Sequence, residues 1–148
     1  MTPLTIHDFT GLYDHLNHKT LHSLAATHDR LSTVYHPSIV FVDPFHTLNG
    51  LDALSRYFFN MYRSVESIRF HYGHYWQGEE ADFLRWTMHY RHPSVGKGKE
   101  ITLTGGTELV WQDNRVIRHH DLFDAGAMLY EHLPVMGWAI HKVKDRLG

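Results

Sequence analysis

The sequence predicts an α+β domain in which three N-terminal helices pack on a strongly curved antiparallel sheet. Two observations lead to this prediction. Within the first 62 residues, apolar side chains in three segments recur at intervals of three and four, as on one face of a helix. Between residues 67 and 123, apolar and polar side chains alternate in segments that turn-forming residues separate. Helices followed by a run of strands is the element order of an α+β fold.

The helical pattern occupies three segments, near residues 9–16, 21–31 and 51–62. Thr20 is a candidate N-cap of the second segment, because a threonine hydroxyl can accept a backbone N–H at a helix start. The second segment must end by His36, because a residue before a proline avoids the α conformation. The apolar positions are Phe9, Leu12, Tyr13 and Leu16 in the first segment; Leu21, Leu24, Ala25, His28 and Leu31 in the second; and Leu51, Leu54, Phe58, Met61 and Tyr62 in the third.

The predicted strands begin between the second and third helices. A short apolar strand is expected at residues 39–42, and Asn49-Gly50 is expected to form a turn. The Gly105-Gly106 pair inside a later strand predicts a bulge or a sharp bend, as a strongly curved sheet requires. The other predicted strands cover residues 67–76, 82–92, 100–111 and 116–123, with a Gly- and Lys-rich loop at 93–99 and an Asp-Asn turn at 112–115.

The composition limits the classes of function. A chain of 148 residues with 43% apolar residues fits one globular domain with one core. Its net charge of −2 gives no electrostatic basis for nucleic-acid binding. The absence of cysteine excludes disulfides, thiol catalysis and zinc–thiolate sites. No apolar run could span a bilayer and no signal-peptide pattern begins the chain, so a cytoplasmic location is expected.

Two further features concern the histidines and the C-terminal segment. The chain has 15 histidines, and His15, His18 and His22 could line one helix face. No carboxylate completes a site there, so no metal is expected. Residues 125–148 form a predicted C-terminal helical extension, broken at Pro134, with basic residues near its end. We expect it to pack on the body or across a dimer; a lid or a peripheral membrane contact is the alternative.

The segment from Tyr35 to residue 62 resembles part of a known family. A helical region ends at Tyr35, a strand follows, and an Asp43-Pro44-Phe45 corner leads through Gly50 into the next helix. This order is similar to that of ketosteroid isomerase, in the nuclear transport factor 2-like superfamily, which includes the SnoaL-like polyketide cyclases. The resemblance covers about residues 9–124 of a single domain, 1–148, and implies a cone-shaped fold with a pocket between the helices and the sheet.

The resemblance also implies roles for four polar residues. The corner aspartate is the catalytic base of ketosteroid isomerase, and this role would fall on Asp43. In SnoaL-like cyclases an aspartate and a histidine transfer protons in the same cavity, and this pair would be His119 and Asp121, which share one face of their strand. Tyr13 would match the tyrosine that donates to the oxyanion. The structural alternatives are a turn former for Asp43, a hydrogen-bonded strand end for the pair and a core tyrosine for Tyr13.

Aromatic residues dominate the predicted pocket and favour a hydrophobic ligand. Two positions depart from ketosteroid isomerase, because Thr107 falls on or next to a donor aspartic acid and Phe58 on a supporting tyrosine. The resemblance is therefore more specific for the fold than for steroid isomerisation. Besides the four polar residues, the expected lining is Phe45, Tyr57, Phe58, Trp86, Met88, Thr107, Trp111 and Phe123.

Two functions are compatible with these residues. The first is a SnoaL-like small-molecule-binding protein with an apolar pocket and no turnover. The alternative is a cofactor-independent isomerase, cyclase or hydratase that transfers a proton on a hydrophobic carbonyl ligand, with Asp43 as the base. Both predict a homodimer and a hydrophobic small-molecule partner, and neither requires a cofactor. Convergence of Asp43, His119 and Asp121 in an open cavity favours the enzyme, whereas a filled cavity excludes it.

Overall fold

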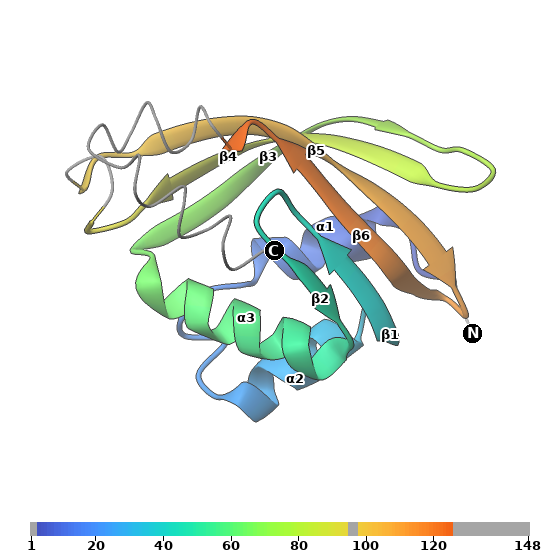
Figure 1. The fold of residues 1–148 in the computed structure, drawn as a ribbon, viewed down its shortest axis with the longest axis horizontal. Helices are drawn as coiled ribbons and strands as arrows, with labels where there is room; N and C mark the ends of the chain where they lie inside the picture. Colours follow the sequence, from blue (N-terminus) through green and yellow to red (C-terminus); the bar gives the residue numbers. More distant parts are fainter. Residues whose placement is uncertain (1–2, 95–97, 126–148) are drawn as a thin grey trace.

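The computed structural model describes residues 3–94 and 98–125 (Figure 1). In this part of the chain, three helices lie on one side of an arched six-stranded sheet, which confirms the α+β class. The elements are α1 (Ile6–Asp14), α2 (Leu24–Ser32), β1 (Tyr35–Val42), β2 (Thr47–Asn49), α3 (Leu51–Ser64), β3 (Ser67–Trp76), β4 (Asp82–Arg91), β5 (Ile101–Gln112) and β6 (Arg115–Phe123). The helical extension predicted for residues 125–148 lies outside the described residues, apart from Ala125. None of the described helices is long and apolar enough to cross a membrane.

Side-chain caps define the start of the first two helices. Thr5 and Asp8 form a capping box at α1, in which the Asp8 carboxylate accepts the Thr5 N–H at 2.7 Å. Ser23 is the N-cap of α2, because its hydroxyl accepts the N–H of Ala26 at 3.0 Å. The prediction that Thr20 caps this helix was wrong. Thr20 instead donates its hydroxyl to a backbone carbonyl in the connection from α1, which forms its own turn before α2 begins.

Gly50 joins the short edge strand β2 to α3. Its φ is 92°, a conformation that favours glycine, and its N–H donates to the carbonyl of Ile39 at 2.7 Å. The predicted Asn49-Gly50 turn is thus a strand end followed by a helix cap. Sequence patterning missed β2, because three residues are too few to show an alternation. The apolar face predicted for α3 is present, since Leu51, Leu54, Phe58 and Tyr62 are buried.

The sheet is mixed, so the prediction of an antiparallel sheet was wrong in one pairing. The strand order is β2-β1-β6-β5-β4-β3, and β1 runs parallel to β6 whereas every other neighbouring pair is antiparallel. The parallel register places Phe41 beside His119. Strand β1 is remote from β6 in sequence, so no tight turn determines their relative direction. Local alternation of side chains carries no information on such a pairing.

A tight turn joins β5 to β6, as predicted. Asp113 and Asn114 have φ values of 53° and 61°, which is typical of the two-residue turns that match the twist of hairpin strands. Beyond an irregularity near this turn, the register places Thr107 opposite Asp121 and Leu109 opposite His119. The turn therefore decides which side chains of β6 face the helices.

The Gly105-Gly106 pair makes room for two aromatic rings and does not form a bulge. The pairing of β5 with both of its neighbours is unbroken at these residues. A Cβ atom on Gly105 would lie 2.6 Å from the ring of Trp86, and one on Gly106 would lie 2.2 Å from the ring of Phe83. Each glycine thus lets an aromatic side chain of β4 lie across β5.

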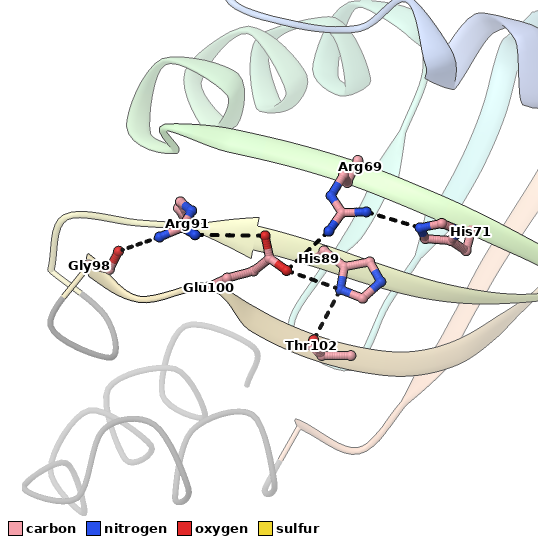
Figure 2. Close-up of polar contacts among 7 residues, drawn as sticks. All are labelled: Arg69, His71, His89, Arg91, Gly98, Glu100 and Thr102. Carbon is pink, nitrogen blue, oxygen red and sulfur yellow. Dashed lines mark hydrogen bonds and ion pairs between the residues drawn. The ribbon is translucent and has the colours of Figure 1, made fainter.

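The face of the sheet that turns away from the helices is polar over β3, β4 and the start of β5. Glu100 forms ion pairs with Arg69 at 3.1 Å and Arg91 at 4.0 Å, and lies 3.5 Å from His89 (Figure 2). His89 also contacts the Thr102 hydroxyl at 3.0 Å. Since alternate residues of a strand lie on opposite faces, this polar row leaves the inner face of the same strands to apolar side chains.

We expect Gly105→Ala to lower the free energy of unfolding by about 1–3 kcal/mol, the usual effect of overpacking a filled core. The added methyl would meet the Trp86 ring and, at 2.7 Å, the carbonyl oxygen of Leu122, and a strand backbone cannot easily move aside. Gly11→Ala is the control. A Cβ at this α1 position meets nothing within 4 Å, so alanine should stabilise the helix by about 0.5–1 kcal/mol. Urea unfolding measures both variants; wild-type stability of Gly105→Ala would contradict the packing argument.

Candidate functional site

A cavity of about 290 Å³ lies between the helices and the inner face of the sheet. Its wall is built by α1, α3, the end of β1 and strands β3 to β6. The cavity is aromatic in character, since most of its bulky wall residues are Phe, Tyr or Trp. Of the residues predicted to line a pocket, the wall contains Tyr13, Asp43, Phe45, Tyr57, Phe58, Trp86, Met88, Thr107, His119, Asp121 and Phe123.

The structure places Trp111 outside this wall, unlike the prediction. Its indole N–H donates to Oδ2 of Asp82 at 3.0 Å, and the Tyr75 hydroxyl donates to the same oxygen. The β5–β6 register shifts between Val110 and Trp111. The extra residue of this shift lies on β6, so Trp111 stays on the inner face of β5 and packs against the core. It lies beyond the cavity along β5, where it joins a separate polar cluster with β3 and β4.

Aromatic rings pack edge to face around the cavity. The ring of Phe41 lies 5.8 Å from that of Phe58 at an interplanar angle of 89°, and the ring of Tyr13 lies 5.6 Å from that of Phe70 at 90°. These are favourable geometries for ring pairs. Phe41 also covers the imidazole of His119, with ring centroids 4.5 Å apart. The polar groups of the wall are therefore surrounded by apolar surface.

His119 and Asp121 form the polar centre of the wall. They project from the same face of β6, and Nε2 of His119 lies 2.7 Å from Oδ1 of Asp121. The side chain of His119 is 2% exposed and that of Asp121 is 20% exposed. The imidazole is thus enclosed, while the carboxylate keeps an open side. In a neutral imidazole, a carboxylate partner selects the tautomer that carries its proton on the bonded nitrogen, here Nε2.

Thr107 and Trp86 hold Asp121 from the neighbouring strands. The Thr107 hydroxyl donates to Oδ1 of Asp121 at 2.5 Å, and Nε1–H of Trp86 donates to the Thr107 hydroxyl at 2.8 Å. An indole N–H can only donate, so Thr107 accepts from it and sends its own proton to the carboxylate. Both hydrogen bonds to Asp121 from the described residues fall on Oδ1. Its Oδ2 is therefore left for a ligand or solvent.

Two tyrosines continue the hydrogen-bonded chain on the other side of His119. The Tyr35 hydroxyl lies 2.8 Å from Nδ1 of His119 and 2.6 Å from the hydroxyl of Tyr13. Tyr35 is fully buried and is not part of the cavity wall, whereas Tyr13 lines it. From the sequence, Tyr35 was used only to mark the end of a helical region and was not assigned to the site. The sequence did hold one signal for this role, a tyrosine next to a predicted buried strand. Such a tyrosine is expected to be buried, and a buried phenol needs a hydrogen-bond partner.

Asp43 lines the cavity, and its hydrogen bonds also hold the turn after β1. Its Oδ1 accepts the backbone N–H of Phe45 at 2.8 Å and that of His46 at 2.7 Å. Tyr57 donates to its Oδ2 at a longer 3.5 Å. Within the described residues, no hydrogen bond joins Asp43 to His119 or Asp121. The three predicted polar residues thus share one cavity but do not meet at one point.

Tyr90 adds a hydroxyl that sequence reasoning did not assign to the site. It lies on β4, lines the cavity and is 5% exposed, and its hydroxyl has no hydrogen-bond partner among the described residues. An unpaired buried hydroxyl costs free energy, so this group is available to a ligand. In residues 3–94 and 98–125, no cluster of His, Asp or Glu side chains has an arrangement that could hold a metal ion.

The phenols of the wall are held in their neutral form. Burial raises the pKa of Tyr13 and of Tyr35 well above the ordinary phenol value, and the negative charge of Asp121 adds to the rise. Burial likewise raises the pKa of Tyr57, where the charge of Asp43 adds to the effect, and the pKa of Tyr62. At neutral pH these groups therefore act as hydrogen-bond donors and acceptors and not as charges.

An arched sheet that closes with helices around an aromatic cavity defines a class of α+β domains. Within this class, a model of the SnoaL-like domain family matches residues 9–119. The chain belongs to this family, which confirms the resemblance drawn from the sequence. A search of curated protein sequences finds no match.

Solved structures show the same fold at low sequence identity. An NTF2-like protein of unknown function from Exiguobacterium sp. 255-15 has a TM-score of 0.66 and 18% identity, over 82% of this chain and 99% of that chain. A protein from Shewanella putrefaciens CN-32, provisionally described as a SnoaL-like polyketide cyclase, has a TM-score of 0.63 and 17% identity, over 90% and 99%. TerC, co-crystallised with polyporic acid, has a TM-score of 0.63 and 14% identity, over 95% and 97%.

Alkaline pH should unfold the protein through its tyrosines. Burial raises the phenol pKa values in the folded state, so the unfolded chain loses phenol protons first as the pH rises above about 10. The stability that neutral tyrosines contribute is complete below that pH and is lost above it. In a Tyr130→Phe background, which removes the one tyrosine outside the described residues, we expect phenolate absorbance and loss of circular dichroism in a single transition. Phenolate absorbance that rises while the dichroism stays constant would contradict the burial.

Replacement of Asp43 should separate its turn-forming role from its carboxylate charge. Asp43→Ala leaves the N–H groups of Phe45 and His46 without their acceptor, which should lower the free energy of unfolding by about 1–3 kcal/mol. Asp43→Asn keeps an acceptor oxygen and should lose less than half of that amount. Urea unfolding of both variants measures the difference, and equal losses would show that the charge, not the acceptor, stabilises the turn.

Proposed function

We propose that the protein binds a hydrophobic small molecule in this cavity and transfers a proton on an oxygen-bearing part of it, as an isomerase or a cyclase does. The observation that carries the proposal is the His119–Asp121 pair, with nitrogen and oxygen 2.7 Å apart in the wall of a mainly aromatic cavity. Proton donors and acceptors of this kind inside a concave apolar site are the usual components of acid–base catalysis.

The size and lining of the cavity favour a compact ring-containing ligand. Its volume of about 290 Å³ is close to the lower end of typical ligand sites, about 300–1,000 Å³. Phe70 and Trp86 supply flat apolar surface, with ring centroids 5.6 Å apart at 89°. The structural neighbour TerC was crystallised with polyporic acid, which supports a small molecule as the partner of this fold.

Two separate polar points favour a ligand with oxygen functions toward both ends. Trp86, whose indole leads through Thr107 to Asp121, and Tyr90, whose hydroxyl is unpaired, lie on the same strand. Four residues of a strand span about 13 Å between Cα atoms. A ligand of two or three rings could therefore contact Asp121 with one end and Tyr90 with the other.

In this proposal the proton transfer belongs to Asp121 and His119, whereas sequence reasoning gave the base role to Asp43. Among the described residues, no hydrogen bond reaches Oδ2 of Asp121, and His119 and Thr107 fix its Oδ1. Oδ1 of Asp43 already accepts two backbone N–H groups, so this carboxylate is committed to holding the turn after β1. The non-catalytic binding function shares the same ligand class and lacks only the proton transfer. The proposed protein is a homodimer, as the resemblance implies.

The proton transfer can be tested with 2-tetralone, a bicyclic ketone with exchangeable protons beside its carbonyl. We expect the protein to accelerate deuterium uptake at these carbons in D₂O, followed by NMR. Asp121→Asn removes the base and should reduce the acceleration by about 10²–10⁴-fold. Asp52→Asn is the control, because this α3 carboxylate is 87% exposed and does not line the cavity. Saturable 2-tetralone binding without acceleration would leave the binding function alone, and no binding would exclude both.

A further inference from the structure

Tyr35 is a buried hydroxyl to which the proposed proton transfer assigns nothing. It comes from the start of β1, has no exposed surface and stands between two groups that do line the cavity. Its oxygen is 2.8 Å from Nδ1 of His119 and 2.6 Å from the hydroxyl oxygen of Tyr13. A phenol has a single proton, so it can donate to only one of these partners at a time.

With a neutral His119, the direction of every hydrogen bond in this row is determined. The proton of the imidazole is on Nε2, facing Asp121, so Nδ1 can only accept. Tyr35 must then donate to Nδ1, and its oxygen is left to accept from Tyr13. The only proton of Tyr13 is thereby used inside the wall. Toward the cavity, Tyr13 offers a lone pair.

With a protonated His119, every one of these directions reverses. Nδ1 now carries a proton and must donate to the oxygen of Tyr35. Tyr35 then sends its own proton to the oxygen of Tyr13, which is its other partner within the described residues. The hydroxyl proton of Tyr13 is released from the wall. Toward the cavity, Tyr13 offers a donor.

We propose that Tyr13, Tyr35 and His119 form a proton relay that connects the imidazole to the oxygen atom of the ligand, with Tyr35 as the positioning residue; the proposal rests on the function proposed above. In one direction, the O–H bond of a ligand enol or phenol breaks and its proton passes to Tyr13. The Tyr13 proton passes to Tyr35, and the Tyr35 proton forms the new N–H bond at Nδ1. Three protons each move by one step, so the net transfer is one proton from the ligand to Nδ1 of His119. No electron is exchanged, and the products are a ligand oxyanion and an imidazolium.

The relay defines the chemical class of the ligand. Its end state holds the oxyanion by a hydrogen bond from Tyr13, and its reverse protonates that oxyanion. The matching substrates are molecules whose oxygen alternates between hydroxyl and oxyanion, such as enolisable ketones and phenols. An ether or a simple hydrocarbon has no such oxygen. Asp121 completes the relay, because its carboxylate at 2.7 Å stabilises the imidazolium.

The surroundings of His119 suit such a relay. The rings of Phe9 and Phe41 lie 5.7 Å and 4.5 Å from the imidazole and exclude water from it. Besides one another, the titratable and charged groups that act on Tyr13 and Tyr35 are Tyr62 on α3, Tyr72 on β3 and Asp121 on β6. Asp43, at the end of β1, and Tyr57, on α3, line the same cavity. Of the two carboxylates among these groups, Asp121 is the one in hydrogen-bond contact with His119.

The relay predicts different pH dependence for two ligands of similar shape. 2-Tetralone can only accept a hydrogen bond at its oxygen, whereas 2-naphthol can accept or donate. In the state with a protonated His119, Tyr13 is a donor, and in the state with a neutral His119 it is an acceptor, so 2-tetralone should lose affinity in the neutral state and 2-naphthol should keep it. We expect the ratio of the two dissociation constants to change about fivefold between pH 5 and pH 8, the effect of one hydrogen bond.

Tyr35→Phe is the variant that interrupts the relay without removing a group from the cavity wall. The Tyr13 hydroxyl then no longer responds to His119, so the ratio of dissociation constants should become independent of pH. Tyr75→Phe is the matched control, because it removes a hydroxyl that is bonded to Asp82 outside the cavity wall, and should retain the pH dependence of the wild type. A ratio that changes equally in wild type and Tyr35→Phe would overturn the relay.

The tautomer of His119 can be measured in the wild type, without a ligand and without a stable variant. In protein labelled with ¹⁵N-histidine, we expect His119 in its neutral form to carry its proton on Nε2, with Nδ1 as an acceptor. A neutral form protonated on Nδ1 would overturn the relay. The relay and the ligand function can fail separately. The relay stands if His119 shows the expected tautomer and Tyr35→Phe shifts its Nδ1 resonance. If, in that case, neither 2-tetralone nor 2-naphthol binds, the proposed ligand function fails. If both probes bind with ratios independent of pH in the wild type, the relay fails and the binding function stands.

Discussion

The parallel pairing of β1 with β6 is the constraint on which the rest of the site depends. It brings the first of the described strands beside the last one, with Phe41 next to His119. Tyr35 enters the site from the start of β1, and Asp43 lies just beyond its end. Without this pairing, the imidazole would have neither its aromatic cover nor its phenol partner. The sheet would also lack the continuous inner face that encloses the cavity.

The sequence allowed much of the architecture to be predicted, because helix and strand periodicity are local properties. The apolar face of α3, the alternation of β4 and the turn before β6 all follow from residues close to each other in the chain. The parallel direction of β1 does not, since it depends on contacts between residues more than seventy positions apart. The cap of α2 was misplaced because Thr20 and Ser23 are both good caps, and only the turn that Thr20 stabilises decides between them.

The candidate site shows the same limit. Parity along β6 placed His119 and Asp121 on one face, and the structure has both of them in the cavity wall. Trp111 was also expected in the wall, but it lies beyond the cavity along β5, where it contacts Asp82. Tyr35 and Tyr90 were not assigned to the site, because the role of a buried hydroxyl depends on partners that periodicity does not identify. Sequence patterns thus identify faces, whereas hydrogen-bond partners require the three-dimensional structure.

The position of β6 at the end of the described sheet also has a consequence for biosynthesis. β6 lies between β1 and β5, so the earlier strands form two separate groups until it is made. During translation, β1 and β5 both present unpaired edges, and such edges favour association with other chains. The strand that closes the sheet also carries the His119–Asp121 pair. A nascent chain therefore completes the wall of its cavity and covers these two strand edges in a single late step.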